Sequence, residues 1–286
     1  MEVLSVKLDI RKLFSAFFLL VFLGSTTMFV LSFFDKQKGE ASYQMAESLA
    51  NIAVEAPVED PTEALTEESI ENTEPSEPVK RQWKPAPVAD KDPYLLILKH
   101  LNLRDLRAVN PQVAGWIYIP DTKVNYPILH GEDNDYYLTH TWEGNSNACG
   151  SIFLEAMNSA RFTDFNTIIY GHNMKNGSMF STLHDYVDLS FWEQHPYVYL
   201  VTDEGVVRYE IFSSYDAGVN SQAYGLSFHK VQTREEFIQA AVENSDIDVG
   251  IVPEVTDRIL TLSTCTGWSY RERRVVHAYL PMELSE

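Results

Sequence analysis

Two short segments near the C-terminus bring a thiol close to a guanidinium. The first, Ile259 to Thr264, is apolar and β-prone and is followed by Cys265; the second runs from Val275 to Leu280. Arg273 and Arg274 precede the second segment, and because strand side chains alternate between faces, only one arginine can face the cysteine. A neighbouring guanidinium favours the thiolate and can hold a carbonyl oxygen. The pattern therefore indicates nucleophilic catalysis, and a buried structural cysteine is the alternative.

A cysteine nucleophile needs a histidine partner that is distant in sequence and close in the fold. His172 lies in the loop that begins with Gly171 after the predicted strand Thr167 to Tyr170, and catalytic groups are common in such loops. His277 shares a strand face with Arg273 but lies roughly 13 Å along it, so we interpret His277 as a packed residue. The other six histidines have no partner pattern and are interpreted as surface or core residues.

The remaining chemistry in the sequence is sparse. A disulfide between Cys149 and Cys265 would abolish thiol chemistry, but a domain of this size does not need one, and Cys149 fits the start of a predicted strand. The sequence contains no His-Glu-x-x-His, Cys-x-x-Cys, Gly-x-Ser-x-Gly or phosphate-binding glycine motif. We therefore expect no metal and no cofactor.

The composition limits the possible partners. The chain has 286 residues, 45% of them hydrophobic, which is enough for one globular domain with a core. Its formal net charge of −19 excludes a nucleic-acid-binding protein, which needs an excess of Lys and Arg. Residues 40–79 hold 11 acidic side chains and no Lys or Arg, so this segment carries more than half of the excess charge.

The N-terminal part has the composition of a membrane anchor. Residues 13–34 form a run of 22 residues without a charge, long enough for a helix that spans a bilayer. A cleaved signal peptide would have a shorter apolar core and a cleavage site, so we predict an uncleaved anchor. Basic residues within 1–12 favour a cytoplasmic N-terminus and an extracellular catalytic domain.

The prolines and the acidic residues divide the rest of the chain. Six prolines and many carboxylates in 35–90 predict an extended, mostly disordered stalk. From 91 to 286 many short strands follow without regular βαβ alternation, which is typical of an antiparallel sandwich or a closed barrel. Two short helices, split near Asn102, precede the strands, and another helix lies between late strands. The predicted class is mainly β.

Further motifs occur along the chain: Asn110-Pro111-Gln112 with Gly115-Trp116-Ile117, Asp133-Asn134-Asp135-Tyr136-Tyr137-Leu138, Ile169-Tyr170-Gly171-His172-Asn173-Met174 and Leu262-Ser263-Thr264-Cys265. These motifs resemble those of sortases, the membrane-anchored cysteine transpeptidases of Gram-positive bacteria, and in particular class B. The similarity covers about residues 92–282 in order, and it includes the Cys265, His172 and Arg273 set. The family arginine lies five residues before an alanine matched by Ala278, which selects Arg273 over Arg274.

The resemblance implies a closed, eight-stranded β-barrel and a two-step reaction. Cys265 would attack the Thr carbonyl of an Asn-Pro-x-Thr-like sorting motif near the C-terminus of a secreted protein and form a thioester. An amine of a peptidoglycan precursor would then resolve it. His172 would be the ion-pair partner and proton carrier, Arg273 would stabilise the oxyanion, and Ser263 and Thr264 would contact the substrate.

One departure and several alternatives accompany this interpretation. Some class B members carry an acidic residue shortly after the cysteine, whereas Thr266-Gly267-Trp268 follows here, so the loop could shape a different motif preference. A membrane-anchored cysteine endopeptidase that uses water, and a pilin-polymerising sortase that uses a Lys amine, begin with the same acyl-enzyme. A non-catalytic surface module that binds peptide or wall is the third alternative.

Overall fold

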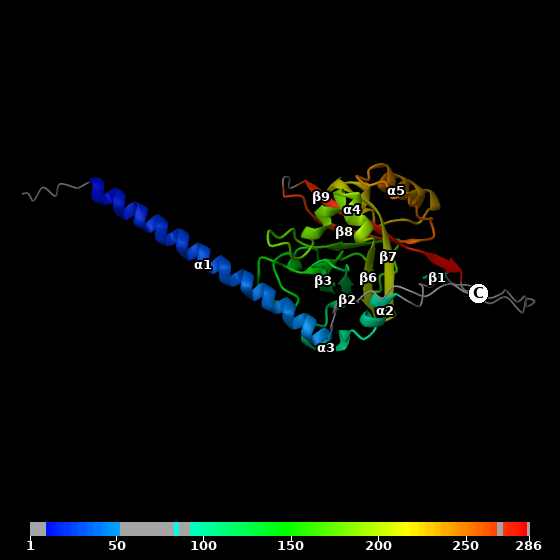
Figure 1. Ribbon diagram of the computed structural model, residues 1–286, viewed down its shortest axis with the longest axis horizontal. Helices are drawn as coiled ribbons and strands as arrows, with labels where there is room; N and C mark the ends of the chain where they lie inside the picture. The colour runs from blue at the N-terminus through cyan, green and yellow to red at the C-terminus, as the bar shows by residue number, and fades with distance from the viewer. Residues whose placement is uncertain (1–9, 52–82, 86–91, 268–270, 285–286) are drawn as a thin grey trace, which may run out of the picture.

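The structure is a computed structural model, and it describes residues 10–51, 83–85, 92–267 and 271–284. Most of the chain after Asp92 forms one closed barrel, in the strand order β2, β3, β4, β5, β8, β9, β7, β6 (Figure 1). The barrel strands are β2 Val113–Tyr118, β3 Asn125–Leu129, β4 Ile152–Leu154, β5 Asn166–Tyr170, β6 Tyr197–Thr202, β7 Gly205–Gly218, β8 Arg258–Cys265 and β9 Glu272–Leu280. The expected closed, eight-stranded barrel is confirmed.

The barrel is mixed and not purely antiparallel. β3 pairs in parallel with β4, and β5 pairs in parallel with β8, while the other pairs are antiparallel. A parallel pair needs a long crossover, and residues 171–257 provide one between β5 and β8. That crossover contains β6, β7 and α5 Val231–Glu243, which is the expected helix between late strands.

Helices pack outside the barrel. In the described residues they are α1 Ile10–Ala50, α2 Pro93–Leu98, α3 Leu103–Val109, α4 Leu189–Gln194 and α5, with short 3₁₀ helices η1 Tyr136–Leu138, η2 Ser181–Val187 and η3 Gln222–Tyr224. Asp92 caps α2 and Asn102 caps α3, so the helix pair splits where the sequence predicts. A further two-stranded pair joins β1 Trp83–Pro85 to β10 Met282–Leu284.

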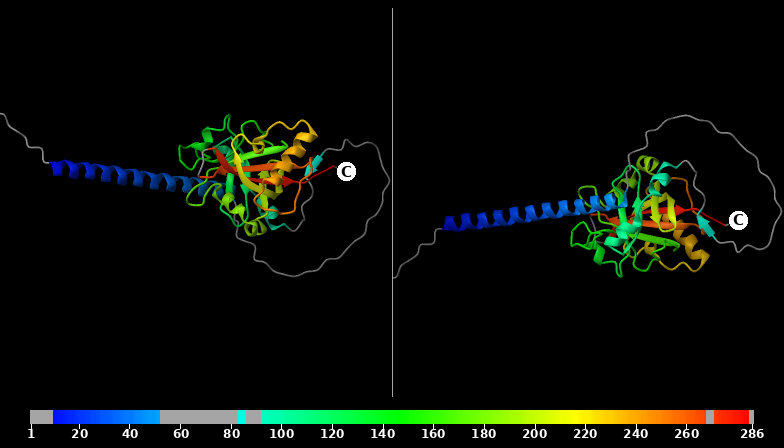
Figure 2. Two further views of the ribbon diagram at one scale, coloured as in Figure 1. Left: turned by 90° about the horizontal axis from the view of Figure 1, so that it is seen from above. Right: turned by 90° about the horizontal axis from the view of Figure 1, so that it is seen from below.

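Helix α1 corrects one prediction from the sequence. The stalk was expected to begin at residue 35, but the helix continues to Ala50, and Tyr43, Ala46 and Ala50 are buried against the barrel. These residues form an apolar stripe at helical spacing, and the first stalk proline, Pro57, comes later. The helix projects from the barrel in Figure 2. Residues 52–82 and 86–91 of the predicted stalk lie outside the described residues.

Side chains of β8 and β9 alternate between two hydrophobic clusters. Leu260, Leu262, Val276 and Ala278 belong to the central cluster inside the barrel. Their strand neighbours pack against outer elements, as Ile259 does beneath α5. Burial on both faces fixes the register of this strand pair, because a slip of one residue would exchange every side chain between faces.

Arg274 ties β9 to two other segments. Its side chain is 7% exposed, and it forms ion pairs with Asp216 of β7 at 2.9 Å and with Asp246, beyond α5, at 2.5 Å. Removing one partner of a buried ion pair leaves charges with poor compensation.

We expect Arg274→Ala to lower the free energy of unfolding by about 2 kcal/mol, since both carboxylates stay partly solvated. Urea denaturation of the full-length protein in detergent, followed by tryptophan fluorescence, measures this change. The matched control is Arg104→Ala, because Arg104 is 90% exposed and its ion pair with Asp105 is long. Equal stability of the two variants would contradict the structural role of Arg274.

Candidate active site

The register of β8 on β9 places Cys265 opposite Arg273. The same antiparallel register pairs Thr264 with Arg274. Residues directly opposite each other share a face, so Cys265 and Arg273 project to the same side, and both line one cavity. Only one of the two arginines accompanies the cysteine, as alternation predicts, and it is Arg273.

The parallel pairing of β5 with β8 brings His172 to the same edge. Tyr170 pairs with Ser263, so the residues two positions beyond, His172 and Cys265, leave neighbouring strands side by side. A side-chain hydrogen bond joins their thiol and imidazole. The three residues predicted from the sequence as the catalytic set therefore lie together.

The pKa values of the thiol and the imidazole shift toward an ion pair. The hydrogen bond to His172 lowers the pKa of Cys265; burial opposes this shift, and the positive charge of Arg273 adds to it. The same hydrogen bond raises the pKa of His172, against the effect of burial and with help from the Leu138 carbonyl. Both shifts favour thiolate and imidazolium over the neutral pair.

Two contacts orient the imidazole. Its Nε2 lies 2.7 Å from the carbonyl oxygen of Leu138 and donates to it, which leaves Nδ1 for the thiol. Gly150 packs against the ring: a Cβ at this position would lie 3.0 Å from Cδ2 of His172 and 2.7 Å from the Leu138 oxygen. Gly150 also has a φ of +58°, so glycine suits both the backbone and the close approach.

A cavity of about 290 Å³ adjoins the cysteine. Ser263 hydrogen-bonds to the Tyr224 hydroxyl at 2.9 Å, at the cavity wall. Thr264 also lines the cavity, but its hydroxyl is buried and finds no hydrogen-bond partner among the described residues. The other lining side chains are mostly apolar or aromatic, and they include Leu138, Phe153, Tyr170 and Val219. Such a cavity can bind an extended peptide.

Two residues at the site escaped the sequence interpretation. Asn173 Nδ2 donates to the carbonyl oxygen of Cys265 at 3.1 Å, and His184 Nε2 contacts the same oxygen at 2.9 Å. Ser181 Oγ in turn holds the Asn173 side-chain oxygen at 3.0 Å. Asn173 is adjacent to His172, which is a weak signal, but His184 comes from η2 and carried no signal of its own.

The other candidate groups have structural surroundings. Cys149 and Cys265 are both free thiols in the structure, and burial raises the pKa of Cys149 to about 11. His277 is fully buried beside Thr261 and Tyr215, and burial lowers its pKa to about 3, as its interpretation as a packed residue requires. Within the described residues, no group of three His, Cys, Asp or Glu side chains could hold a metal.

Comparisons with known proteins agree on one family. Residues 117–281 match the sortase domain family. Sortase B of Listeria monocytogenes is 40% identical over 178 residues, which cover 61% of this chain and 71% of that protein.

Solved structures of sortase B enzymes superpose on the chain. The substrate complex of Staphylococcus aureus sortase B matches with a TM-score of 0.58 and 32% identity, covering 63% of this chain and 84% of that chain. Sortase B from B. anthracis, in complex with AAEK1, matches with a TM-score of 0.64 and 26% identity, covering 88% of this chain and all of that chain.

The pKa shifts predict how the two thiols differ in reactivity. Because the pKa of Cys265 is lowered, its thiolate persists at a lower pH than that of an ordinary cysteine, so alkylation by iodoacetamide should begin at lower pH than for glutathione. His172→Ala should move the profile back toward higher pH. Cys149 should stay unmodified at neutral pH. Mass spectrometry of digests from a pH series measures both sites, and a Cys265 profile like that of glutathione would contradict the ion pair.

Proposed function

This chain belongs to the sortase family, in class B, and from that premise we propose that it cleaves an Asn-Pro-x-Thr-like sorting motif and transfers the acyl group to a peptidoglycan-precursor amine. Class B sortases are cysteine transpeptidases. The main support for placing this reaction here is that Cys265, His172 and Arg273 all line one cavity.

In the first step, the Cys265 thiolate attacks the carbonyl carbon of the motif Thr. The Arg273 guanidinium holds the oxyanion that forms, since it lies on the same strand face as the thiol. As the C–N bond breaks, the His172 imidazolium gives its proton to the leaving amine, and a thioester remains on the enzyme.

In the second step, neutral His172 removes a proton from the incoming amine. The amine nitrogen attacks the thioester carbon, the C–S bond breaks, and Cys265 leaves as the thiolate. The regenerated imidazolium and thiolate are the state that the paired pKa shifts favour. The reaction needs neither metal nor cofactor.

The cavity supports a peptide with an apolar second residue. Leu138, Phe153 and Val219 offer apolar surface that suits a proline ring. The Ser263 and Tyr224 hydroxyls, which bond to each other, can exchange that bond for contacts with a peptide backbone. The Thr264 hydroxyl is buried, so we assign Thr264 to the wall near the cysteine and not to a hydrogen bond with substrate.

The apolar half of α1 supports a membrane location. This helix is long and apolar enough to cross a bilayer, and its apolar stretch is exposed in the chain. We assign residues 13–34 to a single span, residues 1–12 to the cytoplasm and the barrel to the outer surface, where sorting signals emerge.

Incubating the full-length enzyme in detergent with a panel of sorting-motif peptides should give an acyl-enzyme on Cys265, detected by intact-mass spectrometry. Adding triglycine should replace hydrolysed product with ligated product, because the thioester prefers an amine nucleophile. Cys265→Ala should remove both products, while Cys149→Ala should retain them. Hydrolysis that no amine diverts would favour the endopeptidase, and turnover by Cys265→Ala would exclude this nucleophile.

Arg273→Ala should lower kcat/KM by about 10²-fold to 10³-fold, as expected for loss of an oxyanion partner. Its unfolding midpoint should change less than that of Arg274→Ala, because Arg273 is only partly buried whereas Arg274 is buried. Arg274→Ala should show the converse, with lower stability and retained kcat/KM per folded molecule. Peptide cleavage kinetics and urea denaturation on the same preparations measure the two effects, and equal kinetic losses would contradict the assigned register.

A further inference from the structure

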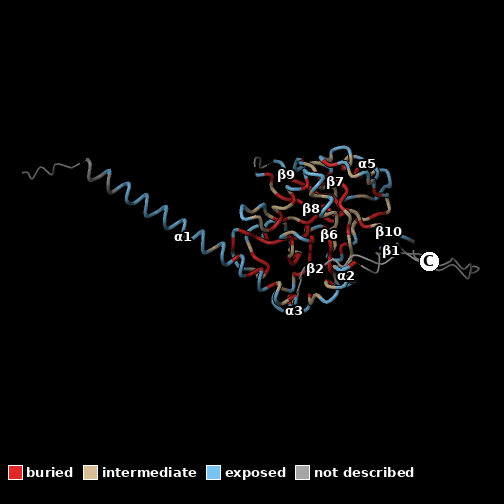
Figure 3. The backbone as a smooth tube through the Cα atoms, in the orientation of Figure 1, coloured by how far each residue is buried: buried red, intermediate tan, exposed pale blue. Residues whose placement is uncertain are grey.

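Helix α1 joins an exposed apolar half to a half that packs on the barrel. From Phe17 to Phe34 its residues are exposed, and large side chains such as Phe22 and Phe29 are 64% and 73% exposed. Beyond Asp35 the same helix carries the buried Tyr43, and Figure 3 shows α1 mostly pale blue, that is exposed, until it reaches the barrel. No break separates the halves, because one helix runs from Ile10 to Ala50.

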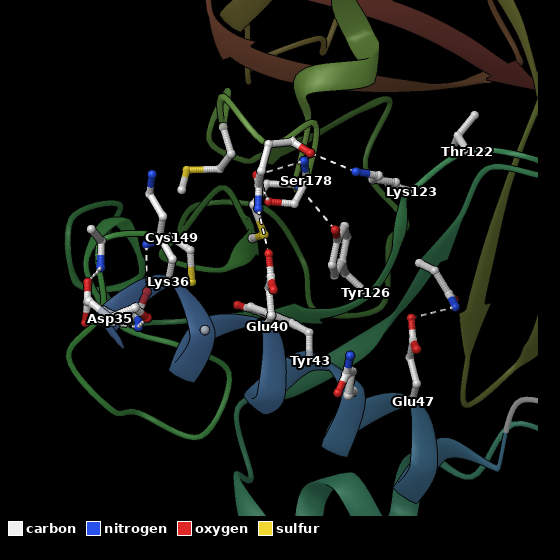
Figure 4. A pocket seen from close by; sticks show the side chains of 18 of the residues that line it. Asp35, Lys36, Glu40, Tyr43, Glu47, Thr122, Lys123, Tyr126, Cys149 and Ser178 are labelled. Atoms are coloured by element: carbon white, nitrogen blue, oxygen red, sulfur yellow. Dashed lines mark hydrogen bonds between the residues drawn. The ribbon is translucent and has the colours of Figure 1, made fainter. Parts of the chain in front are cut away.

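Polar contacts hold the second half of α1 along its whole length (Figure 4). The Tyr43 hydroxyl donates to the Gly150 carbonyl at 2.5 Å, and Trp142 Nε1 donates to the Ser42 carbonyl at 2.9 Å. A helix that swung away from the barrel would leave these buried groups without partners. Further contacts join Ser42 to Glu143, Tyr43 to Ser151, Asp35 to Asn147 and Ala148, Glu40 to Asn176, Glu47 to Asn125, and Ala50 to Asn102.

The end of the barrel nearest the apolar half is the end that carries the site. Gly39 packs against Cys149, since a Cβ on Gly39 would lie 2.9 Å from its Sγ, and the next residue, Gly150, contacts the His172 ring. Ala50, at the other end of the packed half, accepts a hydrogen bond from Asn102 next to α3. Figures 1 and 2 agree, since the start of β9 lies on the side toward which the apolar half projects.

We propose that α1 is a rigid connection between membrane and barrel, called the strut below. It holds the end of the barrel that carries Cys265 and His172 against the lipid headgroups on the extracellular side of the membrane. The inference rests on the proposed membrane span. Gly39 is five residues beyond Phe34, or about 8 Å along a helix at 1.5 Å per residue. The contact of Gly39 with Cys149 therefore lies near the bilayer surface, and the neighbouring Gly150 contacts His172. Lys36 and Lys38 are exposed at this level, where cations suit lipid phosphates.

The acidic segment cannot separate the barrel from the bilayer in this arrangement. The part of this segment beyond α1 starts after Ala50, which is hydrogen-bonded to the catalytic domain, and it is followed by β1, which pairs with β10 of the same domain. The segment therefore begins and ends on the catalytic domain. The spacing between membrane and active site is set by the helix alone.

A fixed distance between the active site and the bilayer implies a preference among substrates. A secreted protein held in the membrane by an apolar run after its sorting motif presents that motif at a set distance from the bilayer. We expect fast cleavage when the motif lies a few residues outside the membrane and slower cleavage when a long spacer raises it. A peptide in solution has no such constraint.

The orientation can be measured directly with the full-length chain. Single fluorophores are placed at Lys175→Cys, beside Asn176 near Glu40, or at Arg104→Cys, near Ala50, in a Cys149→Ala and Cys265→Ala background. In phosphatidylglycerol nanodiscs that contain a headgroup-nitroxide lipid, the label at position 175 should be quenched strongly and the label at position 104 weakly. Equal quenching would overturn the inference.

Two helix substitutions separate docking from anchoring. Gly39→Leu collides with the Cys149 loop, whereas Gly24→Leu is a matched control, because a Cβ on Gly24 meets nothing within 4 Å. With native cysteines, Gly39→Leu should slow cleavage of a membrane-tethered substrate about tenfold by loss of orientation, and it should leave cleavage of a soluble peptide within about twofold. Gly24→Leu should change neither rate.

A third variant keeps the proposal testable even if Gly39→Leu folds poorly. A six-residue Gly-Ser insertion after Phe34 leaves the packed half intact and uncouples it from the span, so it should reproduce the tenfold loss and abolish the difference in quenching. Unchanged turnover of tethered substrate by this variant would overturn the strut. A chain that is absent from sedimented membranes would overturn the span itself, and with it the strut, whereas equal quenching in an active, membrane-bound enzyme contradicts the strut alone.

Discussion

The pairing of β8 with both of its neighbours is the constraint on which the site depends. One neighbour, β9, is antiparallel and sets Arg273 opposite Cys265; the other, β5, is parallel and sets His172 two residues past its pairing with Ser263. Hydrophobic clusters on both faces hold the register of β8 and β9. Cys265, His172 and Arg273 therefore meet at one edge of the barrel, and both His172 and Arg273 lower the pKa of the Cys265 thiol.

Parts of the site that follow from local pattern could be predicted from the sequence. The sequence shows a cysteine at the end of one β-prone segment, an arginine at the start of the next and a histidine after a third. Because strand side chains alternate between faces, only one of Arg273 and Arg274 could lie on the same face as the cysteine. The support for the Cys265 carbonyl was not readable. His184 lies 81 residues before Cys265, and only the barrel closure brings them together. A side chain whose partner is a backbone atom leaves no pairwise signal in composition or spacing.

The same distinction explains the error at residues 35–50. Averaged with the acidic segment that follows, this stretch has the composition of a stalk, and its docking partners lie far along the chain, as Tyr43 and Gly150 do at 107 residues. The helical spacing of Tyr43, Ala46 and Ala50 was present in the sequence, but an apolar stripe does not reveal which surface will cover it. Tertiary contacts, and not local propensity, extend the helix.

In the proposed arrangement, docking of the anchor helix on the barrel changes what the membrane contributes to catalysis. A flexible stalk would raise only the local concentration of enzyme near its substrates, since every orientation of the barrel would stay accessible. A helix bonded to the barrel through Asp35, Ser42, Tyr43 and Glu47 also selects an orientation, and orientation lowers the entropic cost of bringing two further partners to one thiol. Under the proposed function the enzyme binds a peptide and then an amine, so a fixed orientation would help at each step whose partner is also held at the membrane. The loop between Asn147 and Gly150 connects the two functions, because its near end contacts the anchor and its far end contacts His172.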